Sequence, residues 1–287
     1  MSGNGRRLFA GGNGVGCPHH CWGNRKKPRL WRRKLNFAIG LAGGTFGSLF
    51  GLGGGVIIVP LLVRFLGLPQ HTAHGTSLMS LVFTGFVGSL PYLWYRHLDA
   101  SSAFILALSA MGTAHLGAKF CHTLPERKLK RYFGVFLMVM AFFLLSKQYL
   151  GALSDPLTGV ARWLTLIGAG LLTGFLSGLM GIGGGAIMIA FLAILLGFDQ
   201  HLAQGTALLA MIPGGAIGGW TYWKNGQVDK NNLLPLIIGI TLGALAGGTL
   251  AQYIPTDKLR IFFAMILIGL GYRYTQQKTS KESPNGN

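Results

Sequence analysis

Eight apolar runs dominate the sequence, and their lengths restrict what the chain can fold into. They cover residues 35–66, 74–95, 100–121, 132–150, 160–198, 202–223, 233–253 and 261–274. An α-helix needs about 20 apolar residues to cross the hydrocarbon core of a bilayer, and most of these runs approach or exceed that length. Only 11% of the 287 residues are charged, against about 25% in soluble domains. The sequence therefore predicts an all-α polytopic membrane protein whose surroundings are the lipid bilayer.

The positive charge of the chain is concentrated before the first apolar run. Nine lysines and arginines precede residue 35, with no acidic residue among them. By the positive-inside rule, such a flank indicates a cytoplasmic N-terminus. An arm that binds nucleic acid is the alternative, but we expect no nucleic-acid partner. Residues 1–34 are predicted to be a basic cytoplasmic leader, because they are too long and too basic for a cleavable signal peptide.

The leader contains the sequence CPHHC at residues 17–21. Two cysteines and two histidines could hold a metal ion, but the segment lacks the second pair of ligands found in structural zinc sites. We therefore expect a disordered tail here, without a metal or cofactor. The role of this segment is not predicted.

The chain is a duplication with a constant offset of 130 residues. Without a gap, residues 44–129 match residues 174–259. The identical pairs include Gly53/Gly183, Gly54/Gly184, Gly55/Gly185, His71/His201, Gly75/Gly205, Thr76/Thr206, Tyr92/Tyr222 and Asp99/Asp229. We expect two homologous four-element transmembrane repeats, at residues 35–150 and 160–274, with a link at 151–159 and a polar tail at 275–287.

Each repeat carries a glycine block inside an apolar run: LFGLGGGVIIVPLL at residues 49–62 and LMGIGGGAIMIAFL at residues 179–192. Duplicated halves with such interruptions are typical of secondary transporters that bind substrate near the bilayer midplane. A helix break frees backbone groups that lipid cannot satisfy, so it should face protein, water or a ligand. Helix packing is the alternative, because several of the glycines are spaced by four residues. We expect both roles, with substrate bound at Gly53, Gly54, Gly55, Gly183, Gly184 and Gly185.

The basic loops favour a chain that folds back at each glycine block. If residues 35–66 formed one span, the segment PERKLKR at 125–131 would lie outside, against the positive-inside rule. A re-entrant pair of half-helices returns that segment to the cytoplasm and leaves three full spans in each half. An odd number of spans inverts the second repeat relative to the first. We therefore expect inverted repeats with Gly-broken re-entrant half-helices, and continuous spans are the alternative.

The acidic residues disfavour a cation carrier. All seven fall in predicted loops, the link or the tail: Asp99, Glu126, Asp155, Asp199, Asp229, Asp257 and Glu282. Cation sites in membranes usually use a carboxylate, whereas the positive ends of half-helices suit an anion. The glycine blocks lack the spacing of a dinucleotide site, and no phosphate-loop motif occurs. We expect no cofactor and no enzymatic activity, and transport that runs on gradients.

A second shared cluster follows each glycine block, PQHTAHGTS at residues 69–77 and DQHLAQGTA at residues 199–207. A Gly-Thr step at a helix start supplies N–H groups and a hydroxyl, which an oxyanion can accept. The predicted binding residues are therefore His71, Gly75, Thr76, Ser77, His201, Gly205 and Thr206. A polar loop that caps the next helix is the alternative for both histidines, and we prefer it for His74. The aromatic groups at 91–95 and 220–223 are typical of interfacial belts.

The paired GLGGGVIIVPLL and GIGGGAIMIAFL blocks, each followed by HGTS or QGTA, resemble the sulfite exporter TauE/SafE family of bacterial inner-membrane permeases. The resemblance covers residues 37–271, although Ala190 stands where the first repeat has the family's proline, Pro60. It implies export of small sulfur-containing anions such as sulfite or organosulfonates. A permease or channel for another small anion, or a membrane partner of sulfur metabolism, is the alternative. The resemblance selects neither the anion nor the oligomeric state.

Overall fold

The computed structural model describes residues 29–121, 126–146, 159–180 and 184–276, and these residues form helices without any β-strand. The all-α architecture predicted from the sequence is confirmed for this part of the chain. The α-helices are α1 (Arg29–Leu49), α2 (Gly55–Leu61), α3 (Gln70–Trp94), α4 (Ala100–Cys121), α5 (Glu126–Ser146), α6 (Val160–Met180), α7 (Gly185–Leu195), α8 (Gln200–Lys224), α9 (Lys230–Tyr253) and α10 (Thr256–Gln276), and the π-helix η1 covers Leu62–Leu66. The two longest apolar runs are each broken at their glycine block, as predicted.

The helices repeat with the offset found in the sequence. Adding 130 to the bounds of α3 and α5 gives the bounds of α8 and α10. Equivalent helices also make equivalent contacts. Helix α1 packs on α9, and its counterpart α6 packs on α4. Helix α2 packs on α3, and its counterpart α7 packs on α8. Two further pairs, α3 with α8 and α5 with α10, join equivalent helices. The contacts are therefore reciprocal, and helices from the two halves of the chain pack against each other.

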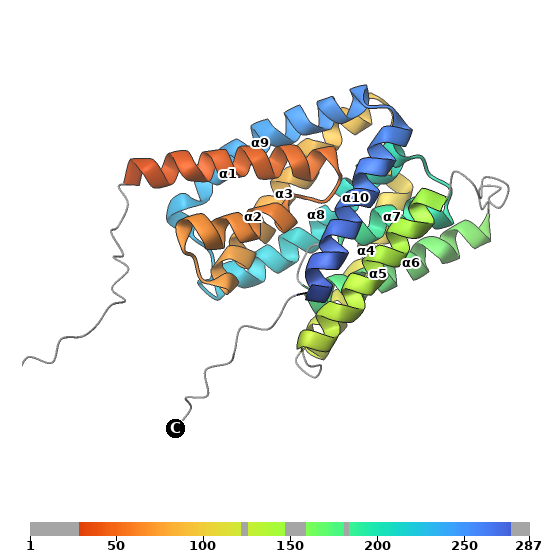
Figure 1. Cartoon of the computed structure of the whole chain (residues 1–287), viewed down its shortest axis with the longest axis horizontal. Coiled ribbons are helices and arrows are strands. Elements are labelled where there is room, and N and C mark those ends of the chain that lie inside the picture. Colours follow the sequence, from red (N-terminus) through yellow and green to blue (C-terminus); the bar gives the residue numbers. More distant parts are fainter. Residues whose placement is uncertain (1–28, 122–125, 147–158, 181–183, 277–287) are drawn as a thin grey trace, which may run out of the picture.

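The first glycine block reverses the direction of the chain. The Gly53 amide donates a hydrogen bond of 3.2 Å to the carbonyl oxygen of Gly47, and a Cβ placed on Gly43 would collide with the Ile58 side chain. Residues before the break therefore lie beside residues after it, and Figure 1 shows α2 running back beneath α1. The glycines of α1 thus serve packing, which is one of the two roles that their spacing predicts.

The repeats differ after their glycine blocks, where Pro60 corresponds to Ala190. Pro60 lies inside α2 and has no N–H group to donate to the preceding turn. The π-helix η1 begins two residues later, at Leu62, whereas α7 continues as a regular helix through Ala190 to Leu195. We attribute the π-helical turn of η1 to the backbone hydrogen bond that is missing at Pro60. Irregular helical turns arise where the i→i−4 hydrogen bonds of an α-helix are interrupted.

Glycines also bring helices of opposite repeats into backbone contact. A Cβ on Gly44 of α1 would lie 2.9 Å from the amide nitrogen of Ala244 in α9. A Cβ on Gly174 of α6 would lie 2.6 Å from Cα of Ala110 in α4. Small residues at such positions let helices approach closely in membrane proteins. The α1–α9 pair, visible side by side in Figure 1, and the α4–α6 pair are therefore built alike.

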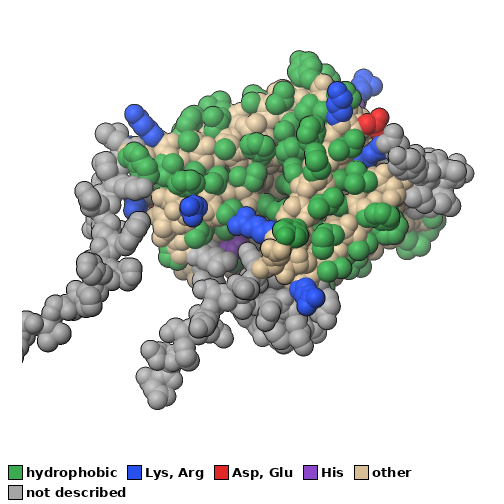
Figure 2. All heavy atoms as spheres, viewed as in Figure 1, with side chains coloured by type: hydrophobic (Ala, Val, Ile, Leu, Met, Phe, Trp, Pro, Cys, Tyr) green, Lys and Arg blue, Asp and Glu red, His purple; other side chains and the backbone are tan. Residues whose placement is uncertain are grey.

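Large apolar side chains cover much of the outer surface. Phe86, Phe104, Leu108, Phe142 and Leu164 are each at least 60% exposed. Figure 2 shows hydrophobic side chains spread over the visible face, with lysine and arginine in only a few places. A soluble monomer rarely exposes so much contiguous apolar surface, whereas a protein surrounded by lipid does.

Within the described part of the chain, three helical segments are long and apolar enough to cross a membrane: Thr72–Trp94, Gln200–Lys224 and Leu233–Tyr253. Shorter apolar helical segments cover Gly55–Leu66, Ala100–Thr113, Gly134–Ser146, Val160–Leu176 and Gly185–Leu195. Together with the apolar surface, these segments support a multi-pass membrane protein.

Candidate functional site

The last glycine of each block is the first residue of the next helix, Gly55 in α2 and Gly185 in α7. Gly54 and Gly184 are the N-cap residues of α2 and α7, with φ values of 78° and 69°. Residues with side chains are disfavoured in this left-handed region, so both positions favour glycine. The carbonyl oxygens of the two glycines accept hydrogen bonds from the amides of Ile58 (2.9 Å) and Met188 (3.0 Å). The first amides of each helix have no acceptor within the helix, and no side chain caps them. That they bind a ligand stays a prediction.

The two glycine blocks meet inside the protein. Gly51 and Gly185 are both buried, and a Cβ on Gly185 would lie 2.8 Å from the carbonyl oxygen of Gly51. A Cβ on Gly51 would lie 2.7 Å from Ile189 Cδ1 and 3.0 Å from Gln204 Cβ. The break of the first repeat is therefore in contact with the start of α7 and with α8.

The two Gly-Thr steps contact the opposite repeat in the same way. Thr76 Oγ1 accepts a hydrogen bond of 3.1 Å from the Asp229 amide, and Thr206 Oγ1 accepts one of 3.1 Å from the Asp99 amide. Thr76 also donates to the Thr72 carbonyl oxygen, at 2.7 Å. Both threonines are buried, so their hydroxyls hold the starts of α9 and α4 against α3 and α8.

The glycines of these steps are points of close approach between the repeats. A Cβ on Gly75 would lie 2.8 Å from Tyr222 Cβ and would collide with the backbone that follows α8. A Cβ on Gly205 would lie 2.7 Å from Tyr92 Cβ and would collide with the backbone that follows α3. Packing therefore requires glycine at both positions. A role for the same residues in binding an anion stays a prediction.

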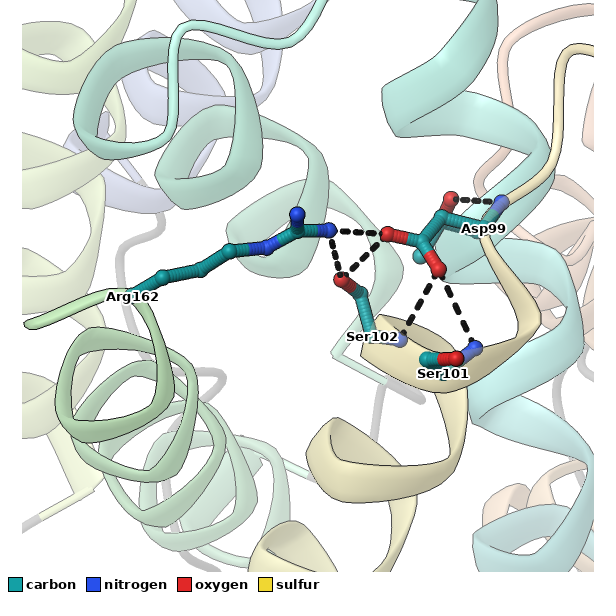
Figure 3. A network of polar contacts seen from close by, with 5 residues as sticks. Asp99, Ser101, Ser102 and Arg162 are labelled. Atoms are coloured by element: carbon teal, nitrogen blue, oxygen red, sulfur yellow. Dashed lines mark hydrogen bonds and ion pairs between the residues drawn. The ribbon is translucent and has the colours of Figure 1, made fainter. Parts of the chain in front are cut away.

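Asp99 holds a polar network at the contact between α4 and α6 (Figure 3). Its carboxylate accepts hydrogen bonds from the Ser101 amide (3.1 Å), the Ser102 amide (3.2 Å) and the Ser102 hydroxyl (2.7 Å). Arg162 of α6 forms an ion pair with this carboxylate and donates a hydrogen bond of 3.1 Å to Ser102 Oγ. Asp99 therefore caps α4 and ties it to α6. Asp99 was expected in a loop and this role was not predicted, although an aspartate just before a helix signals a cap.

His201 lies against a second histidine that the sequence analysis did not single out. The rings of His97 and His201 stack, with centroids 5.1 Å apart. His201 Nε2 lies 3.1 Å from the Ile254 carbonyl oxygen, and His97 Nδ1 lies 2.7 Å from Gln252 Oε1. Both partners are acceptors, so these ring nitrogens carry protons. In the neutral ring His201 Nδ1 is then a buried acceptor, and it has no hydrogen-bond partner within the described ranges.

Tyr92 is buried, so the interfacial belt predicted for residues 91–95 is wrong at this position. Its side chain is 0% exposed, and its hydroxyl lies 3.0 Å from the Ser48 carbonyl oxygen and 3.1 Å from Gln204 Oε1. Trp94, two residues later, is 86% exposed. Residues two apart lie on opposite faces of a helix, so the aromatic group at 91–95 cannot belong to a single interfacial face.

Some of the remaining predicted residues lie within the described part of the chain, and the others lie outside it. Gly53, Gly54 and Gly55 are buried next to the turn that follows α1, and Ser77 is 3% exposed. The Ser77 carbonyl oxygen accepts a hydrogen bond of 2.7 Å from Ser80 Oγ. The His71 side chain, Gly183 and the CPHHC segment at residues 17–21 lie outside the described part of the chain.

Comparison with known proteins agrees with the helical, duplicated architecture. A family profile described as sulfite exporter TauE/SafE matches residues 32–278. The probable membrane transporter protein YunE of Bacillus subtilis is 27% identical over 255 residues, which cover 81% of this chain and 93% of that protein. A probable membrane transporter protein of Methanocaldococcus jannaschii is 26% identical over 254 residues, covering 83% and 93%.

A plant protein also matches over part of the chain. The sulfite exporter TauE/SafE family protein 6 of Arabidopsis thaliana is 31% identical over 116 residues, covering 40% of this chain and 26% of that protein. No solved structure matches the chain.

Proposed function

Because the chain belongs to the sulfite exporter TauE/SafE family, we propose that this membrane transporter exports small sulfur-containing anions of the sulfite or organosulfonate type. The observation that carries the proposal is the meeting of the two glycine breaks, where Gly185 adjoins the carbonyl oxygen of Gly51. Curated relatives are described as transporters, which favours transport over catalysis.

The physical chemistry of the breaks suits an anion. α7 starts there with a glycine cap that offers no side-chain acceptor, and the first N–H groups of a helix have no acceptor within it. The aligned peptide dipoles place about half a positive charge at such a helix start. Among the helices described, only α5 and α10 contain an acidic residue, Glu126 and Asp257 in their first turns. An anion would therefore meet no carboxylate within the α1–α4 and α6–α9 helices.

The substrate would be held by groups from both repeats. The proposed binding residues are the glycines of the two blocks, the two Gly-Thr steps with Ser77, and the histidines at equivalent positions of the two repeats. They are Gly53, Gly54, Gly55, His71, Gly75, Thr76, Ser77, Gly183, Gly184, Gly185, His201, Gly205 and Thr206. The hydrogen bonds and close contacts described above position the Gly-Thr steps at the α3–α8 interface. That interface lies between the repeats, where transporters with duplicated halves bind substrate.

In the membrane, the two repeats would be inverted. The fold-back at Gly47 and Gly53 supports re-entrant half-helices that leave three full spans in each repeat. With this count the N-terminus, the segment at residues 125–131 and the C-terminal tail face the cytoplasm, and the link at 151–159 faces outward. The bacterial inner membrane is the proposed location.

A permease or channel for another small organic or inorganic anion is the main alternative, because the breaks attract negative charge without selecting its chemistry. The test is a binding screen of the purified full chain against sulfite, thiosulfate, ethanesulfonate and acetate, read as a change in Tm. We expect stabilisation by the sulfur oxyanions, because a ligand that binds only the folded state raises its stability. Stabilisation by acetate alone would assign the site to carboxylates instead.

A further inference from the structure

Two glutamines of α8 are buried with side-chain amide atoms that have no hydrogen-bond partner among the described residues. Gln204 is 0% exposed and Gln200 is 1% exposed. Within the described ranges, Nε2 of Gln204 and both amide atoms of Gln200 have no partner. A buried donor that stays unsatisfied destabilises a fold, and most buried polar groups are therefore paired. Buried amides without a protein partner are completed by ordered water or by a ligand, so the position of these amides relative to the glycine breaks decides which of the two they favour.

The hydrogen bonds around Tyr92 leave the Gln204 amide nitrogen available. The Tyr92 hydroxyl has one proton to donate and two acceptors within reach, the Ser48 carbonyl oxygen and Gln204 Oε1. The Ser48 oxygen already accepts a hydrogen bond of 3.2 Å from the Gly51 amide. If Tyr92 donates to Gln204 Oε1, every group in this set except Gln204 Nε2 is satisfied.

The available amide lies beside the glycine breaks. A Cβ on Gly51 would lie 3.0 Å from both Cβ and Cγ of Gln204, and the carbonyl oxygen of Gly51 adjoins Gly185 at the start of α7. Gln200 lies one turn earlier on the same face of α8, with its Cβ about 5–6 Å from that of Gln204. Two amides at this spacing can donate hydrogen bonds of about 2.9 Å to two oxygens of one small oxyanion.

We propose that Gln204, with Gln200, binds the oxygens of a sulfite- or sulfonate-type anion through side-chain N–H groups. This assignment rests on the proposed function and adds side-chain donors to the backbone amides of α7. An amide donates a hydrogen bond without a formal charge, so it holds an anion without the tight ion pair that would slow release. His74 occupies the position of Gln204 in the first repeat, so the two sides of the site differ.

Gln204→Leu separates binding from stability. Leucine removes the unsatisfied donor, and Tyr92 keeps the Ser48 oxygen as an acceptor. The Tm of the anion-free variant should therefore equal or exceed that of the wild type. Anion affinity should fall at least about ten-fold, because a hydrogen bond to a charged group is lost. Gln204→Glu keeps the shape and the acceptor for Tyr92 but presents a negative charge, and it should abolish binding.

Asn36→Leu is the matched control. Asn36 is also buried with an unpartnered amide nitrogen, but it lies on α1, about 20 Å along the helix before the break. Leu166 occupies the corresponding position in the second repeat, so leucine is compatible with the fold. This variant should bind the anion like the wild type.

The measurement is calorimetric titration of the full chain in detergent with sodium sulfite and, separately, with sodium ethanesulfonate. The assignment predicts wild-type affinity for Asn36→Leu and a loss of at least about ten-fold for both Gln204 variants. Unchanged affinity in both Gln204 variants would overturn the assignment and leave the proposed function standing. Failure of the wild type to bind either anion would overturn the proposed function, and the assignment with it.

Discussion

Gly54→Ala should destabilise the fold more than Gly67→Ala, although both glycines have a positive φ, of 78° and 66°. Alanine in this left-handed region costs about 1–2 kcal/mol at either position. The methyl group added at Gly67 meets open space. The methyl group added at Gly54 would lie 2.7 Å from the carbonyl oxygen of Gly43, so the turn and the backbone of α1 must move apart.

Overpacking of this kind costs about 1–3 kcal/mol. Gly54→Ala should therefore cost about 2–5 kcal/mol in total, against about 1–2 kcal/mol for Gly67→Ala. The difference corresponds to a further decrease in Tm of at least about 2 °C. Thermal unfolding of the detergent-solubilised chain, followed by tryptophan fluorescence, measures it. Gly197→Ala, at φ 69° with open space, is a second control. Equal Tm values for all three variants would refute the argument that the glycine block is held by close packing.

Three other predictions concern the polar network, the topology and the energy source. Asp99→Ala removes the α4 cap and the partner of Arg162, so it should cost about 2 kcal/mol. The matched change Asp257→Ala removes a carboxylate that is 69% exposed in its pair with Arg260, so it should cost less than about 1 kcal/mol. Similar Tm shifts for the two variants would contradict the role of Asp99. In a cysteine-free background, single cysteines in the link at 151–159 should react with an impermeant thiol reagent added from outside. Reaction of a cysteine at position 125 with the same reagent from outside would rule out the inverted arrangement. Anion efflux from vesicles should follow the membrane potential, which is worth about 2.3 kcal/mol per charge per 100 mV. Accumulation driven by a pH gradient alone, and lost when His71→Gln and His201→Gln are combined, would instead show proton coupling.

The helix breaks could be predicted from the sequence because their cause is local. A positive φ favours glycine, and both Gly54 and Gly184 have one. At Gly54 there is also no room for a side chain. The offset of 130 residues likewise predicted that equivalent helices would have equivalent bounds. The orientation of the repeats in a bilayer stays a prediction, because it depends on surroundings that the helices alone do not define.

The contacts between the repeats could not be predicted, because they depend on how two matched halves dock. The sequence pairs Thr76 with Thr206 and Asp99 with Asp229, but it does not say that each threonine holds the aspartate of the opposite repeat. Tyr92 was assigned to an interfacial belt from its neighbours, whereas its partner Gln204 lies 112 residues away along the chain. A buried pair of this kind has no local signal in the sequence.

The most direct test of the account is counterflow in vesicles that contain the purified chain. Vesicles loaded with unlabelled sulfite are diluted into a trace of radiolabelled sulfite, and uptake of the label is compared with that of protein-free vesicles. A carrier with one central anion site should accumulate the label transiently above its equilibrium level, because efflux of the unlabelled anion returns empty sites to the outside. Uptake no faster than in protein-free vesicles, with sulfite, thiosulfate and ethanesulfonate alike, would contradict the transport of sulfur-containing anions.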